Sequence, residues 1–167
     1  MFRGIRYNRT KRMKKEQHKL LTNRAIFILS LLGVAVAVYV LQSFLRQSPI
    51  VCISTGCETV RKSPASYPFG IPVPAFGLVG YALLALLSFL RTTTLDARRS
   101  GLLLNGMLGI AVFGVSFVSW FTYTELYIIR GVCTWCAVSA TNMVLLFLLI
   151  LRSYALEKNG IIYETHV

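Results

Sequence analysis

Four long runs of apolar residues constrain this chain more than any other feature. We expect each run to form a membrane-spanning helix, at about residues 25–45, 71–90, 102–123 and 132–151. About 20 helical residues rise roughly 30 Å, the hydrocarbon thickness of a bilayer. The runs have almost no polar faces, and a soluble domain could not bury a chain that is 55% hydrophobic. The predicted fold class is therefore an all-α integral membrane protein, a four-transmembrane-helix bundle.

The basic residues predict the orientation of this bundle. Fourteen of the 18 Lys and Arg residues lie in the N-terminal tail 1–24, the second connection and the C-terminal tail 152–167. Basic residues concentrate on the cytoplasmic side of membrane proteins, so we expect both termini there, flanking a membrane domain at 25–151. The bias of basic residues to the cytoplasmic side and their contact with anionic lipid also account for the net charge of +12. We therefore expect no nucleic-acid partner.

All four cysteines then fall on the non-cytoplasmic side, in two close pairs. Cys52 and Cys57 lie in the first connection, whereas Cys133 and Cys136 form a C-x-x-C motif at the entry to the fourth run. Disulfides persist outside the cytoplasm, and four cysteines allow three pairings. A thiolate at a helix N-terminus is stabilised by the helix dipole. The pattern indicates dithiol chemistry at the outer surface of a membrane.

Two other uses of these cysteines compete with a redox relay. Static disulfides would close loops of only four and two intervening residues, which constrain the unfolded chain very little. A zinc site suits C-x-x-C, but the wider first pair and an oxidising compartment disfavour it. Both histidines lie in the cytoplasmic tails. We therefore favour a relay without a metal, and keep a non-enzymatic assembly protein with static disulfides as the alternative from another class.

The first connection is predicted to be an ordered external loop. All five prolines lie within residues 46–75, and proline stiffens the chain and blocks regular pairing. We expect a short helix at about 57–63 that lies on the membrane and places Cys57 over the bundle. In the short third connection, Glu125 is expected to be a solvated loop residue.

This arrangement resembles the vitamin K epoxide reductase (VKOR) family, most closely its bacterial members. The resemblance covers residues 25–151 and rests on the two cysteine pairs, on Ser63, and on the Pro- and Gly-rich run 69–77 that leads to Tyr81. It implies a quinone-dependent thiol oxidoreductase in which a reduced thioredoxin-like partner attacks at Cys52. Cys57 would then exchange with Cys133, and Cys136, nearest the quinone, would pass the electrons on.

The resemblance also implies a quinone pocket within the bundle, for ubiquinone, menaquinone or a vitamin K type quinone. Ser63 matches a Ser or Thr position of the family. Ser139 and Ala140 follow Cys136 by three and four residues and therefore share its face of the helix. The predicted quinone-binding residues are Ser63, Phe76, Tyr81, Trp135, Ser139 and Ala140.

Only sixteen residues follow Leu151, so we expect a stand-alone member without a fused thioredoxin-like domain. Its partner would be a separate thioredoxin-like (DsbA-like) protein on the external side of the inner, or cytoplasmic, cell membrane. The predicted function is quinone-dependent oxidation of that partner, which drives disulfide formation in exported proteins. The alternative within the enzyme class is reduction of vitamin K epoxide or quinone as the physiological role.

Overall fold

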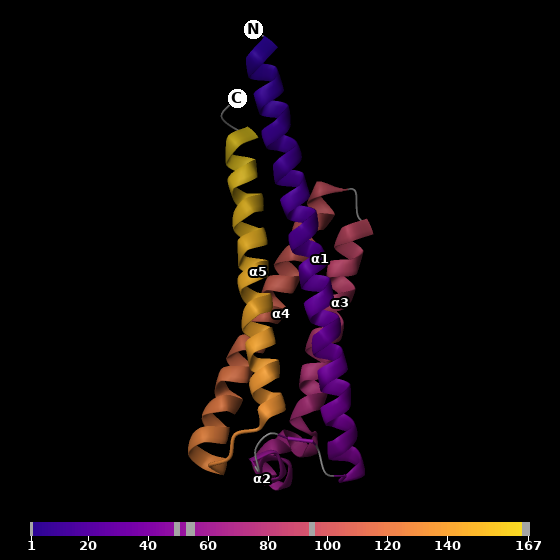
Figure 1. The fold of residues 1–167 in the computed structure, drawn as a ribbon, viewed down its shortest axis with the longest axis vertical. Helices are drawn as coiled ribbons and strands as arrows, with labels where there is room; N and C mark the ends of the chain where they lie inside the picture. The colour runs from indigo at the N-terminus through magenta and orange to yellow at the C-terminus, as the bar shows by residue number, and fades with distance from the viewer. Residues whose placement is uncertain (1, 49–50, 53–55, 94–95, 165–167) are drawn as a thin grey trace.

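The chain folds into helices joined by short loops (Figure 1). The computed structural model describes residues 2–48, 51–52, 56–93 and 96–164, and contains no strand within these ranges. In chain order the elements are α1 (Phe2–Arg46), α2 (Gly56–Lys62), the 3-10 helices η1 (Pro64–Ser66) and η2 (Pro68–Gly70), α3 (Val73–Thr93), α4 (Ala97–Tyr123), the π-helix η3 (Thr124–Ile129) and α5 (Thr134–Glu164). The predicted all-α class is confirmed, as is a short helix between the first and second spans.

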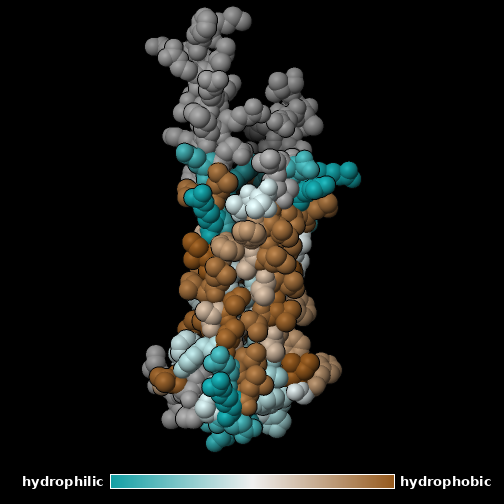
Figure 2. All heavy atoms as spheres, turned by 90° about the vertical axis from the view of Figure 1, so that its right-hand side faces the viewer, coloured by the Kyte–Doolittle hydropathy of each residue, from teal (hydrophilic) through white to brown (hydrophobic). Residues whose placement is uncertain are grey.

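Four helical segments are long and apolar enough to cross a membrane, as predicted. They are Lys19–Arg46, Val73–Thr93, Arg98–Ile129 and Thr134–Lys158. Figure 2 shows a band of hydrophobic side chains around the middle of the molecule, with hydrophilic side chains gathered beyond both of its edges. An outer surface of this kind is stable against lipid hydrocarbon and not against water. The chain is therefore a multi-pass membrane protein.

The helices pack through small residues and a compact apolar core. Helix α1 contacts α3 and α5, and α4 contacts the same two helices. A Cβ at Gly33 of α1 would collide with the Tyr81 ring of α3, and one at Gly114 of α4 would lie 2.8 Å from the Met143 Sδ of α5. Small residues let membrane helices approach closely where larger side chains would separate them. The approach at Gly33 also fixes the position of the Tyr81 ring.

Polar contacts tie the helices together at the end that carries both termini. Arg91 of α3 is buried and donates to Glu157 at 2.9 Å and to Ser153 at 3.0 Å, both on α5. Asn23 of α1 donates to the Ser88 carbonyl of α3 at 2.9 Å. Helix α2 lies at the opposite end of the bundle (Figure 1). The first and third connections therefore share one end, and bring all four cysteines to it.

Candidate functional site

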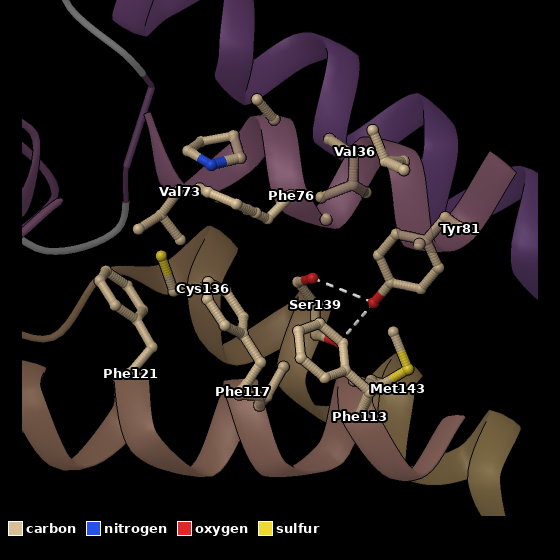
Figure 3. Close-up of a pocket in the computed structure, with 18 of the residues that line it drawn as sticks. Val36, Val73, Phe76, Tyr81, Phe113, Phe117, Phe121, Cys136, Ser139 and Met143 are labelled. Carbon is tan, nitrogen blue, oxygen red and sulfur yellow. Dashed lines mark hydrogen bonds between the residues drawn. The ribbon is translucent and has the colours of Figure 1, made fainter. Parts of the chain in front are cut away.

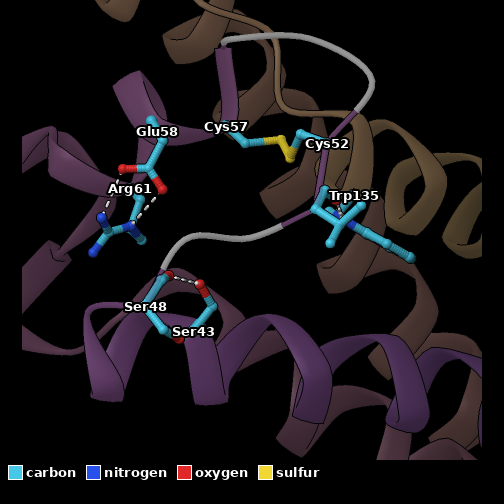
Figure 4. The surroundings of a disulfide bond; sticks show 8 residues. Ser43, Ser48, Cys52, Cys57, Glu58, Arg61 and Trp135 are labelled. Atoms are coloured by element: carbon cyan, nitrogen blue, oxygen red, sulfur yellow. Dashed lines mark hydrogen bonds and ion pairs between the residues drawn. A yellow bond between two sulfur atoms is a disulfide. The ribbon is translucent and has the colours of Figure 1, made fainter.

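The first cysteine pair forms a disulfide between Cys52 and Cys57 (Figure 4). The two Cα atoms are 6.4 Å apart, and Cys57 is buried in the first turn of α2. The other two cysteines, Cys133 and Cys136, are free thiols. Of the disulfides that the sequence leaves open, the structure therefore contains one, the bond between the two cysteines of the first loop.

Helix α2 is stabilised by an ion pair within the helix and by a hydrogen bond at its C-terminal end. The Arg61 guanidinium donates to both carboxylate oxygens of Glu58, at 2.7 and 3.3 Å. This hydrogen bonding raises the pKa of Arg61, which is itself buried. The Ser66 hydroxyl donates to the Val60 carbonyl at 2.6 Å and so anchors the C-terminal end of α2. A helix of seven residues is marginal by itself, and these local contacts stabilise its helical conformation.

Two glycines allow α2 to lie directly on the third connection. A Cβ at Gly56 would collide with the backbone of Val132, and a Cβ at Gly131 would lie 3.3 Å from the Thr59 Cβ. Cys57 and Cys133 consequently belong to one buried apolar cluster, which they share with Val60 and Phe121. The sulfur-bearing residues of the two pairs thus pack in the same small core.

Trp135 links the two cysteine segments by a hydrogen bond. Its Nε1 donates to the carbonyl of Val51 at 2.8 Å, and its ring lies 4.9 Å from the Tyr39 ring, centroid to centroid. Val51 immediately precedes Cys52, and Trp135 immediately precedes Cys136. One side chain therefore sets the position of the first-loop segment at Val51 against the C-x-x-C turn.

A Trp135→Phe substitution is expected to slow disulfide exchange between the two pairs about fivefold. It removes the Nε1 donor but keeps an aromatic ring, and one neutral hydrogen bond is worth about 1 kcal/mol. Rapid mixing with a reduced dithiol, quenching in acid and alkylation of free thiols would measure the exchange. Trp120→Phe, on the exposed face of α4, is the matched control, and equal rates in both variants would contradict the positioning role of Trp135.

The C-x-x-C thiols lie beside a buried carboxyl group. The Sγ atoms of Cys133 and Cys136 and a carboxylate oxygen of Glu125 all lie within 4.8 Å of one another. Hydrogen bonding by the Cys136 thiol lowers the pKa of Cys133. These three groups could offer a metal three donor atoms, whereas structural zinc sites almost always have four protein ligands.

Glu125 corrects one sequence-based expectation. It is 3% exposed and is not a solvated loop residue. The helix of the third span continues past Tyr123 as a π-helix, so Glu125 belongs to that span and turns inward. One signal in the sequence pointed to it: Glu125 is the only acidic residue between Asp96 and Glu157. Isolated ionisable residues inside membrane spans usually serve function.

A cavity of about 620 Å³ lies between α1, α3, α4 and α5 (Figure 3). Its walls are almost entirely apolar and include the rings of Phe76, Phe113, Phe117 and Phe121. The Cys136 sulfur lies at one side of this cavity, beside Val73 and Phe121, as Figure 3 shows. The free thiol of Cys136 therefore borders an apolar chamber.

Tyr81 and Ser139 supply the polar groups of the cavity deeper in the bundle. The Tyr81 hydroxyl donates to the Ser139 carbonyl at 2.8 Å and lies 3.0 Å from the Ser139 Oγ. Small-molecule sites are typically apolar chambers of this size with a few polar groups that orient the ligand. The aromatic walls and these hydroxyls fit a planar ring that carries carbonyl groups.

The structure brings together most, but not all, of the residues predicted for a quinone pocket. Phe76, Tyr81, Trp135 and Ser139 line the cavity together with Cys136. Ser63 and Ala140 are not among the lining residues. The Ser63 hydroxyl instead accepts a hydrogen bond from the Ala65 amide at 3.3 Å and caps η1. Sequence reasoning missed the walls from α1 and α4, which include Val36, Ala37, Val40, Phe113, Phe117 and Phe121.

A family model described as the vitamin K epoxide reductase family matches residues 24–151, which include all four cysteines and the whole of the cavity. No curated protein matches the chain.

Proposed function

The chain belongs to the vitamin K epoxide reductase family, whose members are quinone-linked thiol oxidoreductases, and we propose that it reoxidises a thioredoxin-like partner to drive disulfide formation in exported proteins. The observation that carries the proposal is the shared cluster of Cys57 and Cys133, with Cys136 at the edge of the cavity. Thiol–disulfide exchange needs access between sulfur atoms, and this packing supports it.

The proposed route runs inward through two exchanges. A thiolate of the reduced partner attacks the Cys52 sulfur and releases the Cys57 thiolate. Cys57 attacks Cys133 of an oxidised C-x-x-C pair, and Cys136 leaves as the second thiolate. Resolution of the two mixed disulfides restores the Cys52–Cys57 bond and leaves Cys133 and Cys136 reduced. The structure has one disulfide, Cys52–Cys57, and one dithiol, Cys133 and Cys136. This combination matches the state that the proposed route reaches before the quinone removes electrons from the dithiol.

The cavity is the proposed quinone site. A bound quinone would accept two electrons and two protons from the dithiol. The Phe117 and Phe121 rings would hold the quinone ring by dispersion and exclude water, while the Ser139 hydroxyl, positioned by Tyr81, would donate to a carbonyl group. Whether the ring carries a ubiquinone, menaquinone or vitamin K type tail does not change these contacts.

The proposed setting is the cytoplasmic membrane of the cell, with the cysteines facing outward. The basic residues of the tails and of the second connection support cytoplasmic termini. Helix α2 and both cysteine pairs lie at the opposite end of the bundle. A separate thioredoxin-like protein in the external compartment would then meet Cys52, which is only partly buried.

A steady-state assay tests this function. Purified protein would receive a reduced thioredoxin-like protein and a short-chain quinone, and quinone absorbance would be followed together with the thiol content of the partner. We expect both to fall together. Consumption of vitamin K epoxide, with no oxidation of the partner, would favour epoxide reduction. Two disulfides that resist mild reductant, with no quinone consumed, would favour a static role.

A further inference from the structure

Glu125 is a buried carboxyl group that the route of thiol–disulfide exchange does not use. It is 3% exposed, and its Oε1 atom has no hydrogen-bond partner among the described residues. The Sγ atoms of Cys133 and Cys136 both lie within 4.8 Å of a Glu125 carboxylate oxygen. An ionisable group in an apolar site is costly when it is not neutralised. The position of Glu125 beside two thiols therefore indicates a chemical role.

An unusual backbone conformation, the π-helix η3, places the Glu125 side chain beside the thiols. The π-helix η3 ends at Ile129 and is capped by Arg130, which has a left-handed backbone (φ 54°) and donates its N–H to the Glu125 carbonyl. The Gly131 N–H donates to the same carbonyl at 3.1 Å. Single π turns widen a helix and are frequent at functional sites. This one fixes Glu125 against the C-x-x-C turn that follows.

Reduction of a quinone by a dithiol must move two protons as well as two electrons. Thiolates transfer electrons, whereas thiols first have to lose their protons. The cluster that contains Phe121 and Cys133 is buried and apolar, and apolar interiors hold few water molecules. A base within reach of the sulfur atoms is therefore required, and Glu125 is the carboxyl group that lies within 4.8 Å of both.

We propose that Glu125 is the proton-transfer residue for oxidation of the Cys133–Cys136 dithiol, an inference that rests on the proposed function. The Glu125 carboxylate accepts the proton of the Cys136 thiol as the sulfur gives up its electron pair. The two S–H bonds break and one S–S bond forms between Cys133 and Cys136. Two electrons go to the quinone, and two protons, one of them released again by Glu125, complete the hydroquinone.

A purely structural role for Glu125 makes a different prediction. As an acceptor for the Cys133 N–H, it would only cap the start of α5. The Glu125→Gln variant separates the two roles, because an amide oxygen still accepts that hydrogen bond but an amide cannot take up a proton at neutral pH. The titratable groups that face Glu125 are the two thiols; on its own segment Tyr123, Tyr127 and Arg130 are exposed.

The test is stopped-flow reduction of a short-chain quinone by the pre-reduced full-length protein. General acid–base catalysis contributes about 10²- to 10⁴-fold, so we expect Glu125→Gln to reduce quinone at least about 100-fold more slowly than wild type at neutral pH. The pH profile should change as well: the wild-type rate should rise with pH as the Glu125 carboxylate becomes available as a base, and the Glu125→Gln rate should lack this rise. Glu125→Asp should retain part of the activity.

Two controls keep the outcomes distinct. Glu157→Gln removes a partly buried carboxylate at the far end of the bundle and should leave quinone reduction within about twofold of wild type. The Cys52–Cys57 disulfide of Glu125→Gln should still react with a reduced dithiol at the wild-type rate. A Glu125→Gln variant with normal quinone reduction and a normal pH profile would overturn the inference and leave the proposed function intact. A wild-type protein that reduces no quinone would overturn the proposed function itself.

Discussion

Cys136→Ala is expected to abolish quinone reduction and to trap a disulfide between Cys57 and Cys133. Without the Cys136 sulfur, the Cys133 thiolate can attack Cys57 of the Cys52–Cys57 disulfide and release the Cys52 thiolate, but no Cys136 thiolate is present to attack Cys133 and release Cys57 again. The variant also has no thiol at the cavity. Loss of a nucleophile that acts within a catalytic unit typically lowers the rate by a factor of about 10³ or more. Peptide mapping by mass spectrometry under non-reducing conditions would identify the trapped bridge, and quinone absorbance would measure the loss of activity.

The bridge requires little movement, because Cys57 and Cys133 already pack in one cluster. Cys133→Ala provides the comparison: it should lose activity to a similar extent and form no such bridge. A Cys136→Ala protein that accumulates a disulfide between Cys52 and Cys133 instead would show that the order of exchange is wrong. One that still reduces quinone at a substantial rate would show that Cys136 does not transfer the electrons.

Gly109→Leu is expected to raise the KM for quinone at least about tenfold. Gly109 lines the cavity, and a Cβ added there meets no atom within 4 Å. A leucine side chain would therefore project into the space proposed for the ring, and occupied volume in a preformed site excludes ligand directly. Leucine is also a better helix former than glycine, so α4 should fold at least as well. Steady-state kinetics with a short-chain quinone would measure the change.

Gly106→Leu is the matched control for this substitution. It lies one turn away on the same helix, does not line the cavity, and would place its Cβ at an ordinary 3.6 Å from Leu87. We expect its KM for quinone to match that of wild type. If Gly109→Leu leaves the KM unchanged while the protein remains folded, quinone does not bind in this cavity.

The fold was predictable because membrane helices are encoded by length and composition. A run such as 71–90 is long enough to span hydrocarbon whatever its exact sequence, and the structure has Val73–Thr93 there. The placement of both cysteine pairs at one end of the bundle followed from the two spans that lie between them. The ends of the helices were harder to predict. Helix α4 continues into η3 through a π turn, and Thr124–Ile129 carries no recognised sequence signal for such a turn.

The candidate site was predictable only in part, for physical reasons. Ser139 was found from its spacing to Cys136, since residues three apart share a helix face. The aromatic wall of α4 was not found, because Phe113 and Phe117 belong to a run that is apolar all round and has no face that the sequence distinguishes. Ser63 shows the reverse case, in which a hydroxyl expected near the quinone caps η1 instead.

The most direct test of the central claim is an anaerobic single turnover. Protein with both pairs oxidised would be mixed with one equivalent of reduced thioredoxin-like partner and an excess of short-chain quinone, then quenched over time for mass analysis of the four cysteines. We expect one quinone reduced for each disulfide formed in the partner, with reduction of Cys133 and Cys136 preceding the loss of quinone. Oxidation of the partner while the Cys133–Cys136 pair never becomes reduced, or without stoichiometric loss of quinone, would contradict the account.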